Sequence, residues 1–421
     1  MRVAHPLRLT LLSTGLLLVL PALLLALFPR RLAVGLDRLL PETALLQSFS
    51  ARPAEPPPAL WQQRLGPQQA QRLWSRQRRL WWQFWGPHGD AGSYLVLTAA
   101  EAQPAPAGAV RVDDLLVIAP NPLARQLLLE QLKLQRRPSR GLDRRCTTTL
   151  LQRTAVHWNG VALAQMLGPL APLAAQLQQG CLVLSSEGNR LLWSGEADAT
   201  ADTITDAPDA LAAADAPALE SPQLLQLRGR RLELLLRGLT GSALLRTALA
   251  QRYGLGPEQL QRLQRAPFDL QLRFEPRGPF RAGLAMLVEL PPDRPFWDRW
   301  LRELSRGLQG QGLELNQPLP GLNSWSRADG TVVGGWRWLG PRRLLWFLGP
   351  VPRSLAPSPT LGEADWRLQL RPQALASQRL LPAGLPLVVQ RAQRLQLQGR
   401  GADAGLVGQR QSALNGRLEL N

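Results

Sequence analysis

The sequence contains very little lysine, histidine and cysteine, and each scarcity excludes a kind of site. Among 421 residues, Lys133 is the only lysine, and there are three histidines and two cysteines. A nucleotide-binding P-loop of the GxxxxGK[ST] type needs a lysine, and no such motif is present. A metal site built from several histidines is excluded by their number. We therefore expect no metal and no cofactor.

Signatures of catalysis are missing as well. The sequence has no HExxH, GxSxG, EF-hand or CxxC pattern. His88 lies in a Gly-Pro-His-Gly-Asp segment and is interpreted as a turn residue, and His157 as a packed or surface residue of a strand. Asp198, Asp202 and Asp206 have helical i, i+4 spacing, but a solvated acidic loop is favoured over a cation site.

The chain is strongly basic, with 49 Lys+Arg, 31 Asp+Glu and a formal net charge of +18. Because arginine replaces lysine throughout and leucine replaces isoleucine, coding bias explains much of this arginine content. The densest cluster comprises Arg136, Arg137, Arg140, Arg144 and Arg145. A solvated loop is favoured there, and an anionic lipid or acidic protein surface is the alternative partner. Nucleic acid is not expected, because no reader motif accompanies the cluster.

A single long apolar run stands near the N-terminus. Leu9–Phe28 is 20 residues long without a charge, which as a helix spans about 30 Å, the thickness of one hydrocarbon core. No small-x-small cleavage site follows it, so we predict an uncleaved signal anchor in the lipid bilayer, with a cleaved signal as the alternative. The numbers of positive charges on the two sides of this run are nearly equal, so they do not decide its orientation in the membrane. A short tail and a long following region favour a body outside the cytoplasm, in the periplasm or a lumen.

The composition predicts an α+β fold: an N-terminal transmembrane helix, then mostly antiparallel sheets with helices packed on one face. The boundaries follow proline-rich and acidic stretches. The expected segments are an anchor (1–40), a Pro-rich spacer (41–60), a first α+β unit (61–195), an acidic Ala/Asp/Pro linker (196–222), a second α+β unit (223–352) and a C-terminal β-hairpin region (353–421).

Hydrophobic periodicity places the elements within these segments. Helices are predicted at 67–85, 121–135 with Asn121 as cap, 161–179 and 293–308. Strands are predicted at 93–98, 110–119, 146–152, 154–158, 181–193 with a turn near 187–189, 268–275, 281–290, 331–339 and 343–348, and in the leucine-alternating tail at 366–371, 395–397 and 418–420. The alternation in the tail predicts a sheet with one wet face.

A faint internal echo links the two halves. Trp158-Asn159-Gly160 and the later Arg-Leu-Leu-Trp at 190–193 resemble Trp338-Leu339-Gly340 and the same four letters at 343–346. Two related units, or chance matches in a chain rich in Leu and Arg, both explain this. The whole layout resembles the uncharacterised single-span extracytoplasmic α+β proteins of cyanobacterial type. That resemblance implies no known activity and no functional residues.

The predicted helix at 67–85 is amphipathic, basic and rich in tryptophan. Because tryptophan favours the membrane interface and arginine reaches anionic headgroups, it is a candidate for membrane contact. The alternative is a core helix whose tryptophans pack on the first sheet. The residues concerned are Trp74, Trp81, Trp85, Arg72, Arg76 and Arg79.

Cys146 and Cys181 open two predicted strands that flank the helix at 161–179. If those strands are neighbours in one sheet, the two sulfurs can form a disulfide, which an oxidising compartment would preserve. Two separately buried thiols are the alternative.

Taken together, these features favour a membrane-anchored, non-catalytic extracytoplasmic protein that acts by binding or assembly at the envelope or thylakoid membrane. A module that handles lipid or another apolar ligand is the first alternative, because a half-wet sheet with Trp-rich helices can enclose an apolar slot. An unrecognised hydrolase is the second, since a missing motif does not exclude a convergent site.

Overall fold

The structure is a computed structural model. It describes residues 33–86, 92–134, 139–160, 162, 177–199, 218–233, 235–236, 243–276, 281–357, 360–381, 387–401 and 410–420. The predicted anchor, His88, and most of the predicted helix at 161–179 lie outside these residues. Within the described part, no helix is long and apolar enough to cross a membrane.

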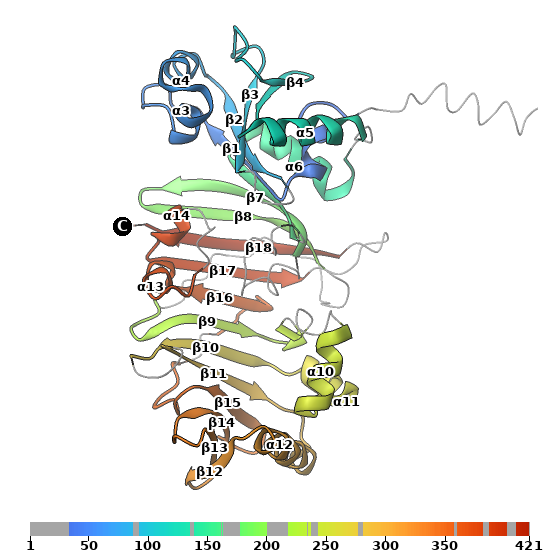
Figure 1. The fold of residues 1–421 in the computed structure, drawn as a ribbon, viewed down its shortest axis with the longest axis vertical. Helices are drawn as coiled ribbons and strands as arrows, with labels where there is room; N and C mark the ends of the chain where they lie inside the picture. The colour runs from blue at the N-terminus through green and yellow to red at the C-terminus, as the bar shows by residue number, and fades with distance from the viewer. Residues whose placement is uncertain are drawn as a thin grey trace, which may run out of the picture.

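The α+β prediction is confirmed, and the strands form one antiparallel sheet (Figure 1). From one edge to the other, the pairings give the order β4 (Val110–Val112), β5 (Leu115–Ile118), β3 (Ser93–Thr98), β2 (Leu80–Trp85), β1 (Leu45–Ser50), β6 (Ala155–Asn159), β7 (Leu177–Glu187), β8 (Arg190–Ala199), β18 (Arg410–Glu419), β17 (Arg394–Gly401), β16 (Trp366–Leu370), β9 (Gln223–Gly229), β10 (Phe268–Phe274), β11 (Ala282–Glu289), β15 (Arg343–Leu348), β14 (Val332–Trp338), β13 (Leu322–Ser326) and β12 (Glu314–Leu319).

The C-terminal strands join the two halves of the chain. Strand β18 pairs with β8 from Arg410–Ala199 to Glu419–Arg190, and β16 pairs with β9. The predicted hairpin region therefore lies in the middle of the sheet, where both of its edges are paired (Figure 1). If β16–β18 extended only one half of the sheet, their outer edge would remain unpaired. Because they lie between β8 and β9, both of their edges are paired.

Helices cover the sheet differently in the two halves. We call face A the side covered by α2 (Leu36–Leu39), α5 (Pro122–Leu134) and α6 (Gly141–Gln152), and face B the side covered by α3 (Ala59–Leu65) and α4 (Pro67–Trp74). By strand register, α12 (Arg294–Gln309) also packs on face B, next to α10 (Ala243–Tyr253) and α11 (Pro257–Gln264). The expectation of helices on one face thus fails in the N-terminal half, where the sheet is covered on both sides.

The predicted helix at 67–85 is wrong in its second half. Helix α4 ends at Trp74, and β2 begins at Leu80. Trp81 lies on face B and Trp82 on face A, and both are buried. A strand covered on both faces has consecutive apolar residues, so the period-two signal disappears and helical spacing fits by accident.

The predicted spacer at 41–60 is not a spacer. Strand β1 lies between β2 and β6, near the centre of the N-terminal strands, and Trp74 Nε1 donates a hydrogen bond to Glu55 O at 2.8 Å. The prolines at 53 and 56–58 follow the strand without interrupting it, so they do not prevent pairing.

The predicted strand at 146–152 belongs instead to α6. Its run of three threonines favours a strand by propensity. In the helix, the hydroxyls of Thr147, Thr148 and Thr149 donate to the carbonyls four residues earlier, at 2.9–3.1 Å. These bonds satisfy the hydroxyl groups within the helix. Residues 177–179, predicted at the end of a helix, lie in β7.

Candidate binding groove

Strand register gathers polar side chains on face A of the central strands. Arg367 on β16 lies opposite Gln398 on β17 and Arg228 on β9, and Gln369 lies opposite Gln396 and Gln226. Gln396 and Gln398 in turn lie opposite Arg417 and Asn415 of β18. The side chains between them point to the opposite face, where leucines predominate. We call this set of arginine, glutamine and asparagine residues the polar belt.

The belt is not a wet face, as the sequence suggested, because it is largely covered. Arg367 is 7% exposed and Gln369 is 2% exposed. Part of the cover comes from the proline-rich segment after β15. In this segment Thr360 O accepts a hydrogen bond from Arg367. Ala356 O accepts a hydrogen bond from Gln271 Nε2, and Ala356 N donates one to Gln271 Oε1. The alternation of apolar and polar residues identified the two faces of these strands correctly. It could not show that a distant segment of the chain covers the polar face.

A groove of about 400 Å³ opens on the belt. Its lining comes from the five strands β7, β8, β16, β17 and β18, and includes Ser185, Arg190, Ser194, Arg367, Gln396, Gln398, Asn415 and Arg417. These side chains supply guanidinium, amide and hydroxyl groups that can bind an oxygen-rich ligand. The groove lies where the two halves of the chain meet, because β8 belongs to the first half and β16–β18 to the C-terminus.

The end of the groove near the β7–β8 turn carries excess positive charge. The guanidinium groups of Arg190, Arg394 and Arg417 lie 3.8, 3.9 and 3.6 Å from the carboxylate of Glu419. One carboxylate therefore faces three guanidinium groups. Glu187, opposite Arg190 in the register, supplies a second carboxylate at the rim. The guanidinium groups still outnumber the carboxylates, so the charge at this end of the groove favours an anionic ligand.

Arg367 is the most unusual residue of the groove. Its Nη1 donates to Thr360 O at 2.9 Å and its Nη2 to Gln398 Oε1 at 3.1 Å, but its buried Nε has no acceptor among the described residues. Burial, and to a smaller extent the positive charge of Arg228, lowers the pKa of Arg367 from its usual value. An anion bound in the groove would offset part of the cost of burying this charge.

The six residues predicted for membrane contact do not form one exposed surface. Trp74 and Trp81 are 3% and 4% exposed and lie in the core between β2 and the α3–α4 pair. Trp81 stacks on Phe49 with ring centroids 4.3 Å apart. Trp85 is half-buried beside Leu45 of β1. The burial corrects the interfacial prediction and fits its alternative, a core role. The exposed members of the set are Arg72, Arg76 and Arg79.

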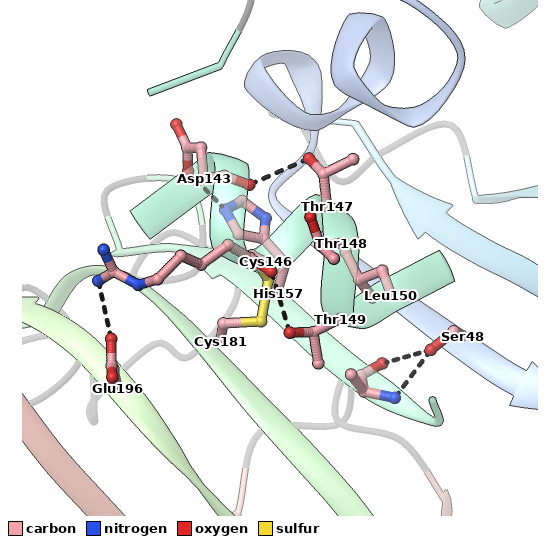
Figure 2. The surroundings of a disulfide bond; sticks show 12 residues. Ser48, Asp143, Cys146, Thr147, Thr148, Thr149, Leu150, His157, Cys181 and Glu196 are labelled. Atoms are coloured by element: carbon pink, nitrogen blue, oxygen red, sulfur yellow. Dashed lines mark hydrogen bonds and ion pairs between the residues drawn. A yellow bond between two sulfur atoms is a disulfide. The ribbon is translucent and has the colours of Figure 1, made fainter. Parts of the chain in front are cut away.

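The two cysteines form a disulfide in the structure, between α6 and β7 (Figure 2). Cys146 extends from the helix on face A to Cys181 in the sheet, and their Cα atoms are 5.6 Å apart. Both residues are buried. The bond ties the α6 layer to the sheet directly. The sequence predicted the two cysteines on neighbouring strands, whereas Cys146 lies on a helix that packs over the strand of Cys181.

His157 lies buried beside the disulfide (Figure 2). Its Nε2 is 3.4 Å from Asp143 Oδ1 at the start of α6. The sequence left open whether His157 is packed or lies at the surface, and the structure shows that it is packed. Arg145, from the same helix, pairs with Glu196 of β8 at 2.8 Å, so part of the predicted arginine cluster also binds the helix to the sheet.

A second groove, of about 550 Å³, lies on face B near the N-terminal strands. Half of its lining is apolar, with Phe49, Trp74, Trp81, Leu184, Leu191 and the prolines at 56 and 58, and the other half is polar, including Gln47, Arg52 and Glu55. Leu184 and Leu191 are half-buried, so apolar surface faces this groove from the β7–β8 hairpin.

The sequence was compared with protein-family models and with curated proteins, and the structure with solved structures. None of these comparisons returned a match.

Proposed function

We propose that this protein is a membrane-anchored, non-catalytic binding protein whose body lies outside the cytoplasm. Its central groove binds a polar ligand that carries an anionic group together with hydroxyl or amide groups. The observation that carries this proposal is Arg367, a nine-tenths buried cation in the lining of an open groove.

Two further features support the setting. The Cys146–Cys181 disulfide fits a compartment in which thiols are oxidised. The uncharged run Leu9–Phe28 has the length of one membrane span and precedes the body. Amide and hydroxyl groups beside the arginines suit a ligand with hydroxyl groups next to its charge, as in an acidic sugar.

Replacement of Arg367 by Gln is expected to weaken anion binding in the groove at least tenfold. Gln keeps polarity at this position but removes the buried charge and the Nε donor. The measurement is isothermal titration calorimetry of the detergent-solubilised full chain with glucuronate and with inorganic phosphate, using glucose as the neutral comparison. Glucuronate should bind more tightly than glucose.

The matched control is Arg337→Gln, because Arg337 is exposed on β14, far from the groove. It should leave the affinity unchanged. If Arg367→Gln does not fold, Arg417→Gln tests the same groove from β18. Equal affinity of glucuronate and glucose, or wild-type affinity in both groove variants, would show that the groove does not select anions.

The face B groove favours a second candidate function, the binding of an apolar ligand. Replacement of Leu191 by Trp should fill this groove and weaken binding of dodecanol at least tenfold, measured by competition with a fluorescent fatty alcohol. Leu348→Trp, at an exposed position on β15, is the control and should have no effect. Unchanged dodecanol binding in Leu191→Trp would exclude this groove as its site.

A further inference from the structure

Helix α5 exposes leucines that the fold does not need. Its buried side is a complete stripe of Ala124, Leu128 and Leu132, which packs on face A of the sheet. Outside that stripe, Leu123 is 67% exposed and Leu127 is 48% exposed. A helix at the surface of a soluble domain normally places polar residues at such positions.

The exposed apolar residues of the described chain gather at two places. Leu123, Leu127 and Leu129 lie on α5, and Val34 and Leu151 lie in the segment before α2 and at the end of α6, within the same helical layer. The others lie at the opposite end of the sheet, on or beside β12, β14 and β15: Leu315, Leu319, Leu339 and Leu348. Scattered exposed leucines need no explanation, but two that are four residues apart share one flank of a helix and suggest a contact surface. Leu123 and Leu127 form such a pair, whereas Leu129 lies on the opposite flank of α5.

Exposed cations accompany the leucines of α5. Arg125 lies between Leu123 and Leu127 in the sequence, and Lys133 lies in the last turn, where it pairs with Glu130 at 2.7 Å. Arg140 and Arg144, at the start of α6, are exposed too. Leucines flanked by arginine and lysine are typical of a helix that lies at a membrane surface containing anionic lipid.

The chain enters the body at the C-terminal end of α5. Arg38, in the first described helix, donates a hydrogen bond from Nη2 to Leu132 O at 2.9 Å. Figure 1 shows α5 beside the place where the described chain begins. Phe28, the last residue of the uncharged run, is five residues before Ala33, a distance of at most about 17 Å in extended chain. A bilayer that held this run would therefore lie close to α5.

We infer that α5 is the surface through which the body contacts the bilayer. Leu123 and Leu127, one turn apart on one flank of α5, enter the headgroup region, and the exposed arginines of α5 and α6 bind anionic headgroups. This inference rests on the anchor in the proposed function and deepens it, because it fixes which side of the body faces the membrane. The polar groove lies on the same face of the sheet as α5, so a ligand near the membrane surface would reach it.

The test places a fluorophore on the proposed surface of the full chain in nanodiscs of phosphatidylcholine and phosphatidylglycerol. The native cysteines are bridged, so Leu127→Cys adds one free thiol for an NBD label. We expect blue-shifted emission and at least threefold quenching by headgroup-region spin-labelled lipid. Leu319→Cys is the matched control: it is 55% exposed, on β12 at the other end of the sheet, and should show neither effect.

A third label, at Leu18→Cys, separates this inference from the proposed function. Quenching at position 18 by lipid spin-labelled in its acyl chain, without quenching at position 127, overturns the α5 surface and leaves the anchor standing. Absence of quenching at position 18 overturns the anchor and the α5 surface with it. Equal quenching at positions 127 and 319 also overturns the inference, because it shows unspecific adsorption. Unchanged circular dichroism confirms that each labelled variant is folded.

Discussion

Reduction of the Cys146–Cys181 disulfide is expected to lower the free energy of unfolding by about 3–4 kcal/mol. The bond closes a loop across a sequence separation of 35 residues, and opening it returns that loop's entropy to the unfolded chain. It also connects α6 to β7, so the helical layer on face A loses its disulfide cross-link to the sheet. Chemical denaturation with and without dithiothreitol measures the difference.

The control is the double variant Cys146→Ala with Cys181→Ala. It should unfold at a denaturant concentration similar to that of the reduced wild type, and dithiothreitol should not change it further. Both sulfurs are buried, so the small cavities add a modest further loss. If dithiothreitol leaves the wild-type transition unchanged, or if the denatured, unreduced protein shows two free thiols, the disulfide is absent.

Replacement of Gly416 by Ala is expected to destabilise the protein by about 3 kcal/mol, although it adds only one methyl group. Gly416 lies on β18, paired with Trp193 of β8 and Leu397 of β17. A Cβ atom there would overlap the indole ring of Trp193 and the backbone carbonyl of Gln396. The ring can move, but the carbonyl belongs to the neighbouring strand, so the strands themselves would have to separate.

Gly340→Ala is the matched control, because an added Cβ at that position meets no atom within 4 Å. It should change stability by less than about 0.5 kcal/mol. The midpoint of thermal unfolding of both variants gives the comparison. Since β18 connects the two halves of the sheet, Gly416→Ala should also increase proteolysis in both halves. Equal stability of the two variants would show that β8, β18 and β17 pack less tightly than in this structure.

Much of the local structure followed from the sequence, because strands with one covered face alternate visibly. The prediction at 93–98 coincides with β3, and the turn near 187–189 separates β7 from β8. The predicted cap is also present: Asn121 Oδ1 accepts a hydrogen bond from Ala124 N at 2.8 Å. Asp293, predicted only as the start of a helix, caps α12 by accepting a hydrogen bond from Phe296 N at 3.3 Å. These signals arise from neighbours within a few residues, so composition and spacing suffice.

The failures share one cause, which is that contacts from distant chain decided the outcome. Strand β2 is covered on both faces by helices that the sequence could not place, and this cover made its alternation disappear. The threonines of α6 favour a strand on their own, but the packing of Leu142, Cys146 and Leu150 into the core selects the helix. Local propensity is worth a few tenths of a kcal/mol per residue, and burial of one leucine outweighs it.

The sequence by itself determined the class of fold, the faces of most strands, the two cysteines and the run long enough for an anchor. Only the tertiary structure decided that the C-terminal strands join the two halves, because antiparallel pairing of distant strands leaves no mark on neighbouring residues. The same pairing created the groove. Arg367 belongs to the wet face of the predicted tail sheet. It joins Gln398 and Arg417 in a largely buried polar site only because the register aligns the three residues and distant parts of the chain cover them.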